Sequence, residues 1–382
     1  MIRILHYYVN FSKPIQERSF YQFYSLTFNT GYISRTKMHK KNFHLKESDC
    51  TIYFNDSFSH LEKIADKSKC ILLIDKIVYK KHTKIFRGWE IILCEGGEEH
   101  KNQKTIQSLI LQLISIGANR ETILVGIGGG VVTDMAGFIA GIYMRGIRFG
   151  FIPTTLLAMV DASLGGKNGV NAEVYKNMIG LISHPSFILY DKRFLSSLPN
   201  KEWVNGFAEI IKHACIFDRT LFKELQKNHL QAYQHDQNKL DKLIAKNVHL
   251  KMKIVQKDPL EKHERKLLNF GHTLGHAIEN ELRLSHGQAI SIGMVAAAKI
   301  SKNILNFKET DEIIALLEKY KLPIHHRMNM ERILPIMLKD KKSNGDTIDY
   351  ILLKSIGKGV IQSLPIPRLF SEFQNVPHAV LH

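Results

Sequence analysis

Short apolar runs alternate with helix-like segments between Lys69 and Asp191, and this alternation constrains the fold more than any other feature of the chain. Five runs have the length and composition of buried strands: KCILLID, WEIILCEGG, ETILVGIGGG, RFGFIPTTLL and SFILYD. Two segments between them have helical spacing: KTIQSLILQLISIG and VVTDMAGFIAGIYMRG. Strands that alternate with helices predict a mostly parallel sheet with crossover helices.

The pattern changes near Leu198-Pro199, where long helical segments take over. They include WVNGFAEIIKHACIF, LDKLIAKNVHLKMKIVQ, LLNFGHTLGHAIENEL, HGQAISIGMVAAAKISKNI and DEIIALLEKY. A chain of 382 residues with 44% apolar composition is long enough for roughly two domains. We therefore expect an α/β domain over residues 38–198 and a helical domain over residues 199–382, with a ligand cleft between them.

Residues 1–37 differ in composition from the rest, with one acid, Glu17, among several bases and many aromatic residues. They lack an apolar core followed by a small-residue cleavage site, so we do not expect a secretory signal. A targeting peptide is one interpretation, and a start codon placed too early, with Met38 as the real start, is the simpler one. Either way, we predict that this extension lies outside the fold.

The chain carries 53 Lys and Arg against 36 Asp and Glu, a formal net charge of +17. This charge suits a nucleic-acid binder, a basic enzyme that attracts an acidic phosphorylated substrate, or a lysine-rich composition without a partner. The lysines are scattered rather than gathered in basic runs, which argues against nucleic acid. The four cysteines form no CxxC pair, and no apolar run approaches the ~20 residues of a membrane span. We expect a reduced, cytoplasmic protein without a membrane partner.

The segment GIGGGVVTD, from Gly126 to Asp134, follows an expected strand and opens an expected helix. Glycines there let the backbone approach a pyrophosphate, and a helix N-terminus offers N–H groups to it. Val131 stands where the third glycine of GxGxxG would be. The motif alone therefore leaves dinucleotide binding and an ordinary strand–helix turn equally open.

Charged and amide side chains follow in three further segments. Lys167 comes after a double glycine in an expected loop, and Lys176 precedes Asn177. Such donors suit phosphate or carboxylate, although a single lysine is more often a solvated surface group. Glu209 and Lys212 share a helix face, either as a surface ion pair or as a metal-binding carboxylate beside a cation.

His272 and His276 stand four apart in an expected helix, as metal-binding histidines often do. The segment lacks the glutamate of HExxH, so it is not that protease motif. His286 follows at an expected helix start. Three histidines and Glu209 in one helical domain favour a metal site, and spacing leaves open which of them are ligands.

Together the segments resemble the 3-dehydroquinate synthase family of sugar-phosphate cyclases, from about Cys70 to the C-terminus. The matching motifs, in order, are GGGVVTD, YMRG, IPTTLLAMVDASLGGK, YKNMIG, GFAEIIKHA, LLNFGHTLGHAIE and DKK. The resemblance implies a Rossmann-like NAD-binding domain, an all-α domain that binds zinc or cobalt, and a homodimer. It also implies a lyase of the shikimate pathway, which serves chorismate and aromatic amino acid biosynthesis.

The implied reaction converts 3-deoxy-D-arabino-heptulosonate 7-phosphate to 3-dehydroquinate and phosphate. Transient oxidation by NAD, β-elimination, re-reduction and an intramolecular aldol cyclisation would follow one another. By the same resemblance the metal ligands are Glu209, His272 and His286. The implied catalytic residues are His276, Lys212, Asn177, Lys167, Arg145 and Asp161, and the implied substrate-binding residues are Lys176, Lys251, Arg265, Asn269 and Lys342. The implied cofactor-binding residues are Asp75, Glu98, Lys101, Gly129, Gly130, Val131, Asp134, Thr154, Thr155, Ser197 and Leu198.

Three details depart from the family pattern. Gln288 replaces the usual glutamate in HGQA beside His286, and loss of a charge that hydrogen-bonds a ligand could weaken metal binding. The stretch between His276 and His286 is shorter than usual, and IDKIVY lacks a small polar pair after Asp75.

Arg265 is expected roughly two turns before His272, near the start of the same helix.

Three other functions compete with the first. A related cyclase that makes a deoxy-inosose or valiolone ring would act on a substrate without a carboxylate, and Lys251, Arg265 and Asn269 match a carboxylate-binding pattern instead. A metal-dependent polyol dehydrogenase would release NADH and need fewer cations. A paralogue that only binds its ligand would not need every charged residue of the mechanism.

Overall fold

The computed structural model describes residues 39–45, 48–173, 175–340, 346–374 and 379–380. The chain divides after Lys37 into two units, and all described residues belong to the second. The extension over residues 1–37 lies outside the described residues, so its predicted independence stays a prediction. None of the described helices is both long enough and apolar enough to cross a membrane.

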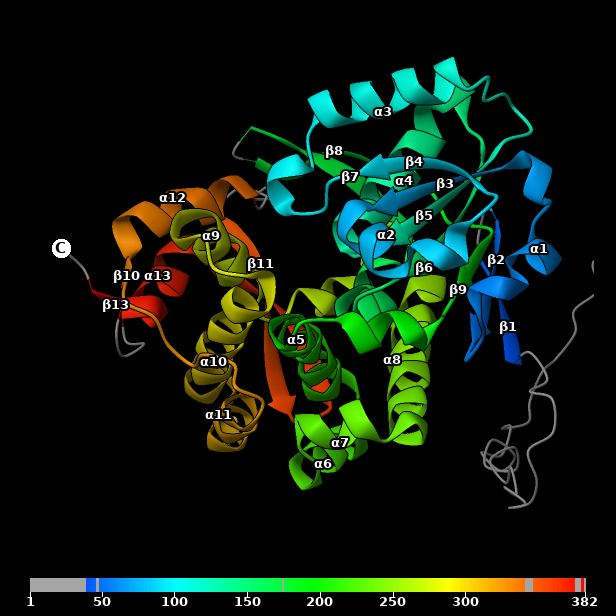
Figure 1. The fold of residues 1–382 in the computed structure, drawn as a ribbon. Coiled ribbons are helices and arrows are strands. Elements are labelled where there is room, and N and C mark those ends of the chain that lie inside the picture. Colours follow the sequence, from blue (N-terminus) through cyan, green and yellow to red (C-terminus); the bar gives the residue numbers. More distant parts are fainter. Residues whose placement is uncertain (1–38, 46–47, 174, 341–345, 375–378, 381–382) are drawn as a thin grey trace, which may run out of the picture. The chain divides into compact units, whose positions relative to one another are not determined.

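A seven-stranded sheet forms the first part of the described chain (Figure 1), in the order β1-β2-β9-β6-β5-β3-β4. All neighbouring strands are parallel except β1 and β2, which pair antiparallel. The five predicted strands are confirmed, and β1 and β2 add an edge that the sequence did not predict. The bounds are β1 (His39–His44), β2 (Asp49–Phe54), β3 (Cys70–Asp75), β4 (Glu90–Cys94), β5 (Ile123–Gly128), β6 (Arg148–Pro153) and β9 (Phe187–Leu189).

Four described α-helices lie on the connections between these strands: α1 (Leu61–Ile64), α2 (Lys76–His82), α3 (Gln103–Ser115) and α4 (Gly130–Ile142). All six residues of β5 are buried, and most of α4 is buried as well. A Cβ on Gly126 would lie 2.6 Å from the Cβ of Ala136, so this glycine lets α4 pack directly on β5. The close packing fixes the N-terminus of α4 at the carboxyl edge of the sheet.

An antiparallel hairpin, β7 (Lys167–Ala172) and β8 (Tyr175–Ile182), follows a short π-helix, η6 (Ala158–Ala162). The expectation that Lys167 lies in a loop is wrong, because Lys167 is the first residue of β7 and pairs with Ile182. Exposed and part-buried residues alternate along much of β8, as in a strand with one open face. The hairpin packs against α4.

Nine helices dominate the described part of the chain after Leu198, as predicted. They are α5 (Asn200–Phe217), α6 (Arg219–Lys227), α7 (Leu230–His235), α8 (Gln237–Lys257), α9 (His272–Leu282), α10 (His286–Leu305), α11 (Thr310–Lys319), α12 (Met330–Asp340) and α13 (Ile366–Gln374). The all-α expectation did not include a hairpin of β11 (Thr347–Ser355) and β12 (Lys358–Pro365), which packs on α10. A short parallel pair, β10 (Met328–Asn329) with β13 (Ala379–Val380), is a second addition.

The expected helix over LLNFGHTLGHAIENEL is interrupted. Its first part is a 3-10 helix, η8 (Glu264–Asn269), and α9 begins only at His272. Gly271, between them, has φ +78°, where glycine is favoured and the helix cannot continue regularly. Arg265 therefore lies on a separate segment and not on the helix of His272.

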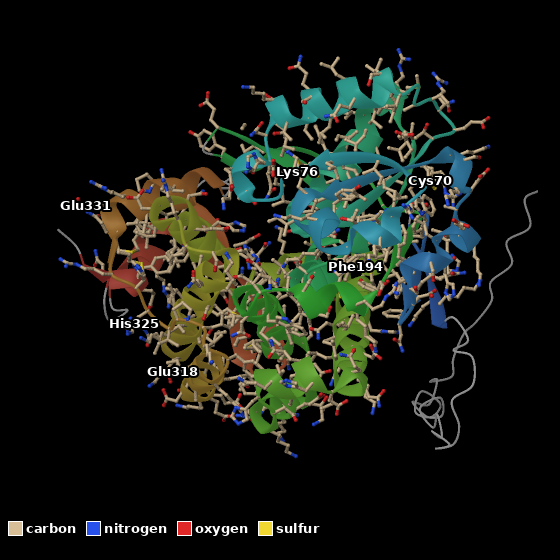
Figure 2. All side chains as sticks on the ribbon, viewed as in Figure 1. Cys70, Lys76, Phe194, Glu318, His325 and Glu331 are labelled. Carbon is tan, nitrogen blue, oxygen red and sulfur yellow. The ribbon has the colours of Figure 1, made fainter. Side chains whose placement is uncertain are left out.

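One continuous apolar core extends from the sheet into the helices. Figure 2 labels Cys70, the first residue of β3, and Lys76, the first residue of α2, which follows that strand directly. A smaller apolar cluster includes Phe194, whose ring is stacked on Phe86 with centroids 6.2 Å apart. The core holds β3, β5 and β6 in register, so that their carboxyl ends meet at one edge.

Candidate metal and substrate site

Three of the predicted site residues converge from three helices. Glu209 lies on α5, His272 begins α9 and His286 begins α10. Their ligand atoms all lie within 4.8 Å of one another. Glu209 Oε1 is 3.0 Å from His286 Nε2 and 3.5 Å from His272 Nε2. Two imidazoles and a carboxylate form a donor set that suits zinc or cobalt.

Close helix packing holds this cluster in place. A Cβ on Gly293 of α10 would lie 1.9 Å from the carbonyl oxygen of Gly271, so only glycine allows this approach of α10 to the start of α9. Glu209 is fully buried and His272 is 9% exposed. The rings of His272 and His276 lie edge to face, with centroids 5.1 Å apart. His276 therefore lies beside the three-residue cluster without being one of its members.

The neutral ring of His272 and the ionised carboxylate of Glu209 also suit a bound cation. Burial, reinforced by the positive charge of Lys212, lowers the pKa of His272 to about 3, so its ring is neutral at pH 7. Burial opposes ionisation of Glu209, yet Lys212 and His272 hold the pKa of that carboxyl well below its usual value. Burial likewise opposes a charge on His286, but contacts with Glu209 and Glu279 raise its pKa to about 10. A divalent cation would therefore compete with a proton at His286.

A second group of charges surrounds Asp161 of η6. Lys251 Nζ on α8 lies 2.6 Å from Asp161 Oδ1 and 2.9 Å from its carbonyl oxygen. His213 Nε2 and Lys212 Nζ, both on α5, lie 3.4 and 4.0 Å from Oδ1. Lys212 also contacts Glu209. Lys212 therefore joins this group to the metal cluster.

Asn247 supports this group from behind. Its side-chain amide donates to the carbonyl of Leu243 at 2.8 Å, which leaves Asn247 Oδ1 to face His213 Nδ1 at 3.0 Å. His213 and Asn247 are both fully buried. Despite the burial of Asp161, the charges of Lys251 and Lys212 hold the pKa of its carboxyl far below the usual value. The carboxylate therefore stays ionised. Burial opposes a charge on both lysines; the carboxylates of Glu209 and Asp161 nevertheless raise the pKa of Lys212, whereas burial lowers that of Lys251.

Carboxylates contact three further predicted site residues, the catalytic candidate Lys167 and the substrate-binding candidates Asn269 and Lys176. Lys167 contacts Glu261, and Asn269 Nδ2 donates to Glu261 Oε1 at 2.7 Å. Lys176 Nζ lies 2.7 Å from Glu279 Oε1. The structure thus brings together three of these donors with two acids that the sequence did not single out.

Arg265 is almost completely buried, at 2% exposure. Its Nη1 donates to the carbonyl of Pro259 at 2.6 Å and its Nη2 to that of Gly165 at 2.8 Å. The bond to Gly165 ties η8 to the turn before Lys167. Each Nη nitrogen keeps a further N–H, so a bidentate contact with a substrate carboxylate stays a prediction.

One described residue of the prediction, Arg145, lies apart from these contacts. Arg145 is exposed and follows the C-terminal end of α4, a helix ~20 Å long that begins at Gly130. It takes part in none of the contacts above. Lys342 lies outside the described residues, so its role stays a prediction.

The predicted cofactor residues gather at the carboxyl edge of the sheet. Asp75 ends β3, Gly129 and Gly130 follow β5, and Thr154 and Thr155 follow β6, and these three strands are neighbours. A Cβ on Gly129 would lie 3.1 Å from Thr155 Cγ2, and one on Gly130 would lie 3.0 Å from the Cβ of Ala162. The absence of side chains leaves the first N–H groups of α4 open to a phosphate. This edge fits a dinucleotide.

The remaining cofactor candidates border the same edge. Lys101 Nζ donates to Asp134 Oδ2 and to Asn177 Oδ1, both at 2.5 Å, so a predicted catalytic residue joins the cofactor side. Glu98 follows β4 and accepts from Asn171 Nδ2 at 2.9 Å, and Val131 lies in the first turn of α4. Asp75 Oδ1 also caps α2 through the N–H of Ile77 at 2.7 Å. Ser197, with Leu198 after it, lies beside α2, because His82 Nε2 is 3.0 Å from Ser197 Oγ.

Sequence reasoning missed Glu261 and Glu279 and gave no role to His213 or Asn247. Glu279 had a signal, since it lies three residues after His276 and seven after His272, on one helix face. Glu261 had none, because it lies between elements with φ +58°. Gln288 turns out to cap α10, since its Oε1 accepts from the N–H of Ser285 at 3.1 Å and from the Ser285 hydroxyl at 2.9 Å.

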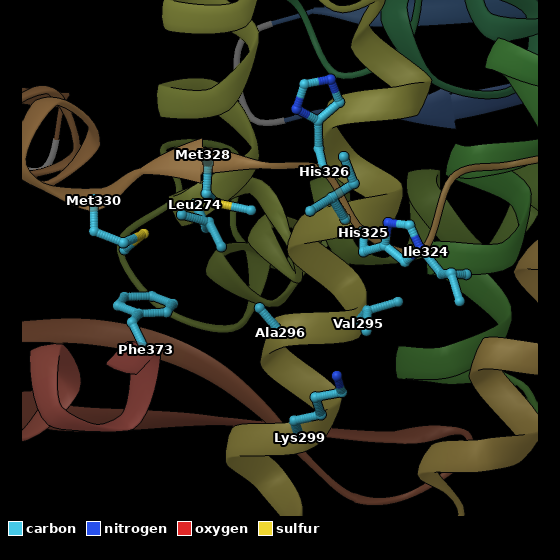
Figure 3. A pocket seen from close by; sticks show the side chains of 11 residues that line it. Leu274, Val295, Ala296, Lys299, Ile324, His325, His326, Met328, Met330 and Phe373 are labelled. Carbon is cyan, nitrogen blue, oxygen red and sulfur yellow. The ribbon is translucent and has the colours of Figure 1, made fainter. Parts of the chain in front are cut away.

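A separate hollow lies in the helical part (Figure 3). Apolar side chains from α9, α10, α13 and the segment before α12 form most of its lining, including Leu274, Val295 and Phe373. None of the predicted site residues lines it. The hollow is therefore distinct from the cluster described above.

Comparison with known proteins agrees with this architecture. Residues 91–205 match the model of the 3-dehydroquinate synthase N-terminal domain, and residues 206–343 match that of the C-terminal domain. A 3-dehydroquinate synthase of Pyrococcus abyssi is 40% identical over 77% of this chain and 86% of its own. That of Campylobacter concisus is 38% identical over 84% of this chain and 95% of its own.

Solved structures of related cyclases share the fold. A 2-deoxy-scyllo-inosose synthase complexed with carbaglucose-6-phosphate, NAD+ and Co2+ has a TM-score of 0.78 and 26% identity, covering 88% of this chain and 99% of its own. A 2-epi-5-epi-valiolone synthase from Streptomyces hygroscopicus with NAD+ and Zn2+ bound has a TM-score of 0.77, covering 91% and 99%, and at 22% identity indicates the fold alone. With both domain models matched and 38–40% identity over most of two relatives, this chain belongs to the 3-dehydroquinate synthase family.

Proposed function

We propose that this chain converts 3-deoxy-D-arabino-heptulosonate 7-phosphate to 3-dehydroquinate and phosphate. Its family relatives are named for this reaction, which is a lyase step of the shikimate pathway. One observation carries the proposal: a largely buried cluster of Glu209, His272 and the part-buried His286 is joined through Lys212 to the cations around Asp161. A metal centre beside several cations suits a substrate that carries both phosphate and carboxylate.

The cluster would hold one divalent cation, zinc or cobalt, through Glu209, His272 and His286. Three protein ligands leave positions open for substrate oxygens. When bound, the metal acts as a Lewis acid on the substrate oxygens. His276, whose ring centroid lies 5.1 Å from that of His272, would move a proton near the metal.

The carboxyl edge of the sheet would hold NAD, with Gly129 and Gly130 and the N-terminus of α4 at its phosphates. The cofactor supplies a reversible hydride transfer, so the net reaction involves no oxidation. Lys101 links this edge to Asn177 on β8 through a 2.5 Å hydrogen bond. The chain can therefore set the cofactor and the substrate against each other across the hairpin.

The cations would fix the two ends of the substrate. Lys167 and Asn269 already converge on one carboxylate, that of Glu261, which supports their use for an anionic group of the ligand. Lys251 Nζ lies 2.6 Å from Asp161 Oδ1, and this ammonium would meet the other end of the substrate. Holding both ends of a flexible sugar favours the conformer that can cyclise over extended conformers of the sugar.

A homodimer is part of the proposal. Exposed apolar side chains lie on α3, on β8 and at the end of α4, and both α3 and β8 contact α4. They include Leu111 at 58%, Ile114 at 57% and Met178 at 58% exposure. An apolar surface of this kind suits a second copy of the chain. Sedimentation should give a dimer for the wild type and a monomer for Met178→Glu. We also propose a cytoplasmic location, which the four free, buried cysteines support.

Substrate preference tests the proposed reaction. Phosphate release should be measured from the heptulosonate phosphate and from glucose 6-phosphate, a sugar phosphate without a carboxylate. We expect turnover of the first and at most trace turnover of the second. The reverse preference would assign the chain to the deoxy-inosose branch. NADH release from polyols without phosphate release would make it a dehydrogenase.

A further inference from the structure

Glu279 lies between the metal cluster and the hairpin and contacts both. Its Oε2 is 3.4 Å from His286 Nδ1, and its Oε1 is 2.7 Å from Lys176 Nζ. The other ring nitrogen of His286, Nε2, faces Glu209 at 3.0 Å. The imidazole of His286 is thus held between a carboxylate inside the cluster and one outside it.

We propose that Glu279 is a positioning residue that aims His286 Nε2 at the metal and couples this ligand to Lys176. By accepting the Nδ1–H, its carboxylate would fix the tautomer that leaves a lone pair on Nε2. The side chain of Glu279 is only 10% exposed, so water competes weakly for this contact. This inference rests on the proposed metal site and adds a residue to it.

The structure assigns this task to Glu279 and not to position 288. Gln288 stands two residues after His286, where the family pattern has a glutamate. Its Oε1 instead accepts from the backbone and hydroxyl of Ser285 at the start of α10. The replacement of a glutamate there therefore leaves the carboxylate beside His286 intact.

Glu279 also connects the two parts of the chain. It lies on α9, whereas Lys176 lies on β8 of the hairpin, and one carboxylate joins them. Removing that carboxylate should weaken the metal site and also misplace Lys176 at the substrate. Removing Lys176 alone should affect the substrate and leave the metal.

Zinc affinity measured by competition with a chelator tests the inference without any turnover. Glu279→Ala should bind zinc about 10- to 100-fold more weakly, the usual effect of losing an outer partner of a ligand histidine. Glu279→Gln preserves the volume and should lose about tenfold, so it carries the test if the alanine variant does not fold. Glu281→Gln, two residues on in α9 and facing Arg332, is the matched control and should bind like the wild type.

A second readout distinguishes positioning from general damage. The visible spectrum of the cobalt-loaded protein should change in Glu279→Gln and stay unchanged in Glu281→Gln and Lys176→Gln, while both Glu279→Gln and Lys176→Gln raise KM. Wild-type zinc affinity and an unchanged cobalt spectrum in both Glu279 variants would overturn the inference and leave the proposed function standing. Failure of the wild type to bind zinc would instead remove the proposed metal site.

Discussion

The metal cluster and the cation group are joined by Lys212, yet the chain builds them differently. Three helices of one part, α5, α9 and α10, supply the cluster, and close packing fixes it. The cation group consists of Lys167 on β7, Lys176 on β8, Lys251 on α8 and Arg265 on η8. The carboxylate of Glu261 contacts Lys167, and that of Glu279 contacts Lys176. We infer that the cluster is a rigid centre, whereas the cations must exchange their carboxylate partners for the anionic groups of the substrate.

Deleting a ligand should have the largest effect on the rigid centre. His272→Ala should lose its bound metal and all turnover while the protein stays folded, because two remaining ligands hold a cation poorly. His276→Ala is the matched control and should keep its metal, since His276 lies beside the cluster. Elemental analysis and circular dichroism provide the readouts. Full metal occupancy in His272→Ala, or metal loss in His276→Ala, would contradict the ligand assignment.

The cation group should respond more selectively. Arg265→Lys should cost on the order of 2–3 kcal/mol of transition-state binding, or about 30- to 150-fold in kcat/KM, because a lysine cannot make a bidentate carboxylate contact. The loss should largely vanish for a substrate analogue without the carboxylate. Equal penalties on both substrates would mean that Arg265 acts only through its bonds to Pro259 and Gly165.

A smaller effect should appear in the pH dependence of stability. The pKa of His272 falls from 6.5 to about 3 on folding, so the unfolded chain binds more protons and stability decreases as pH falls through this window. In the folded protein the raised pKa of His286 keeps this ring protonated, and Glu209 stays ionised, so neither group changes its charge in that state as the pH falls from 6.5 to 5. Well below pH 6.5, where the unfolded His272 is protonated, chelated wild type should lose up to about 1.4 kcal/mol more per pH unit than His272→Gln. The free energy of unfolding would be measured by urea titration at each pH. If it changed equally with pH in both proteins, His272 would not be held neutral in the folded state.

The smallest effect should come from the N-terminal extension. A chain that begins at Met38 should keep the melting temperature and kcat/KM of the full chain, because residues 1–37 differ in composition and precede the family match that begins at residue 91. Differential scanning calorimetry and the phosphate assay check this. A drop of several degrees, or a large loss of activity, would show that the extension packs on the rest.

The two regions also differ in how far the sequence could predict them. Glu209, His272 and His286 stand in recognisable motifs, and helical periodicity placed them on the helices that bring them together. The surroundings of the cations were harder. Lys167 begins a strand, although the sequence predicted a loop. The strand was hard to predict because the pairing partner of Lys167, Ile182, lies well apart from it in the sequence. Gly271 breaks the helix expected to carry Arg265, and a single glycine with positive φ cannot be distinguished from a tolerated one by periodicity.

The acidic partners of these cations, Glu261 and Glu279, were also hard to predict from the sequence. Glu261 reaches Lys167 and Asn269 from a turn, and no local pattern indicates that contact. Glu279 shares a helix face with both histidines, so its place near the cluster was accessible from the sequence, whereas its contact with Lys176 depends on how β8 meets α9. Long-range contacts of this kind need the fold.

The most direct test of the account is the balance of products with and without metal. Purified protein supplied with NAD, zinc and the heptulosonate phosphate should release one phosphate for each 3-dehydroquinate formed, without accumulation of NADH. A chelator should stop both products together, and added zinc or cobalt should restore them together. Phosphate release that persists in metal-free protein, or NADH that accumulates in step with substrate consumed, would contradict the account.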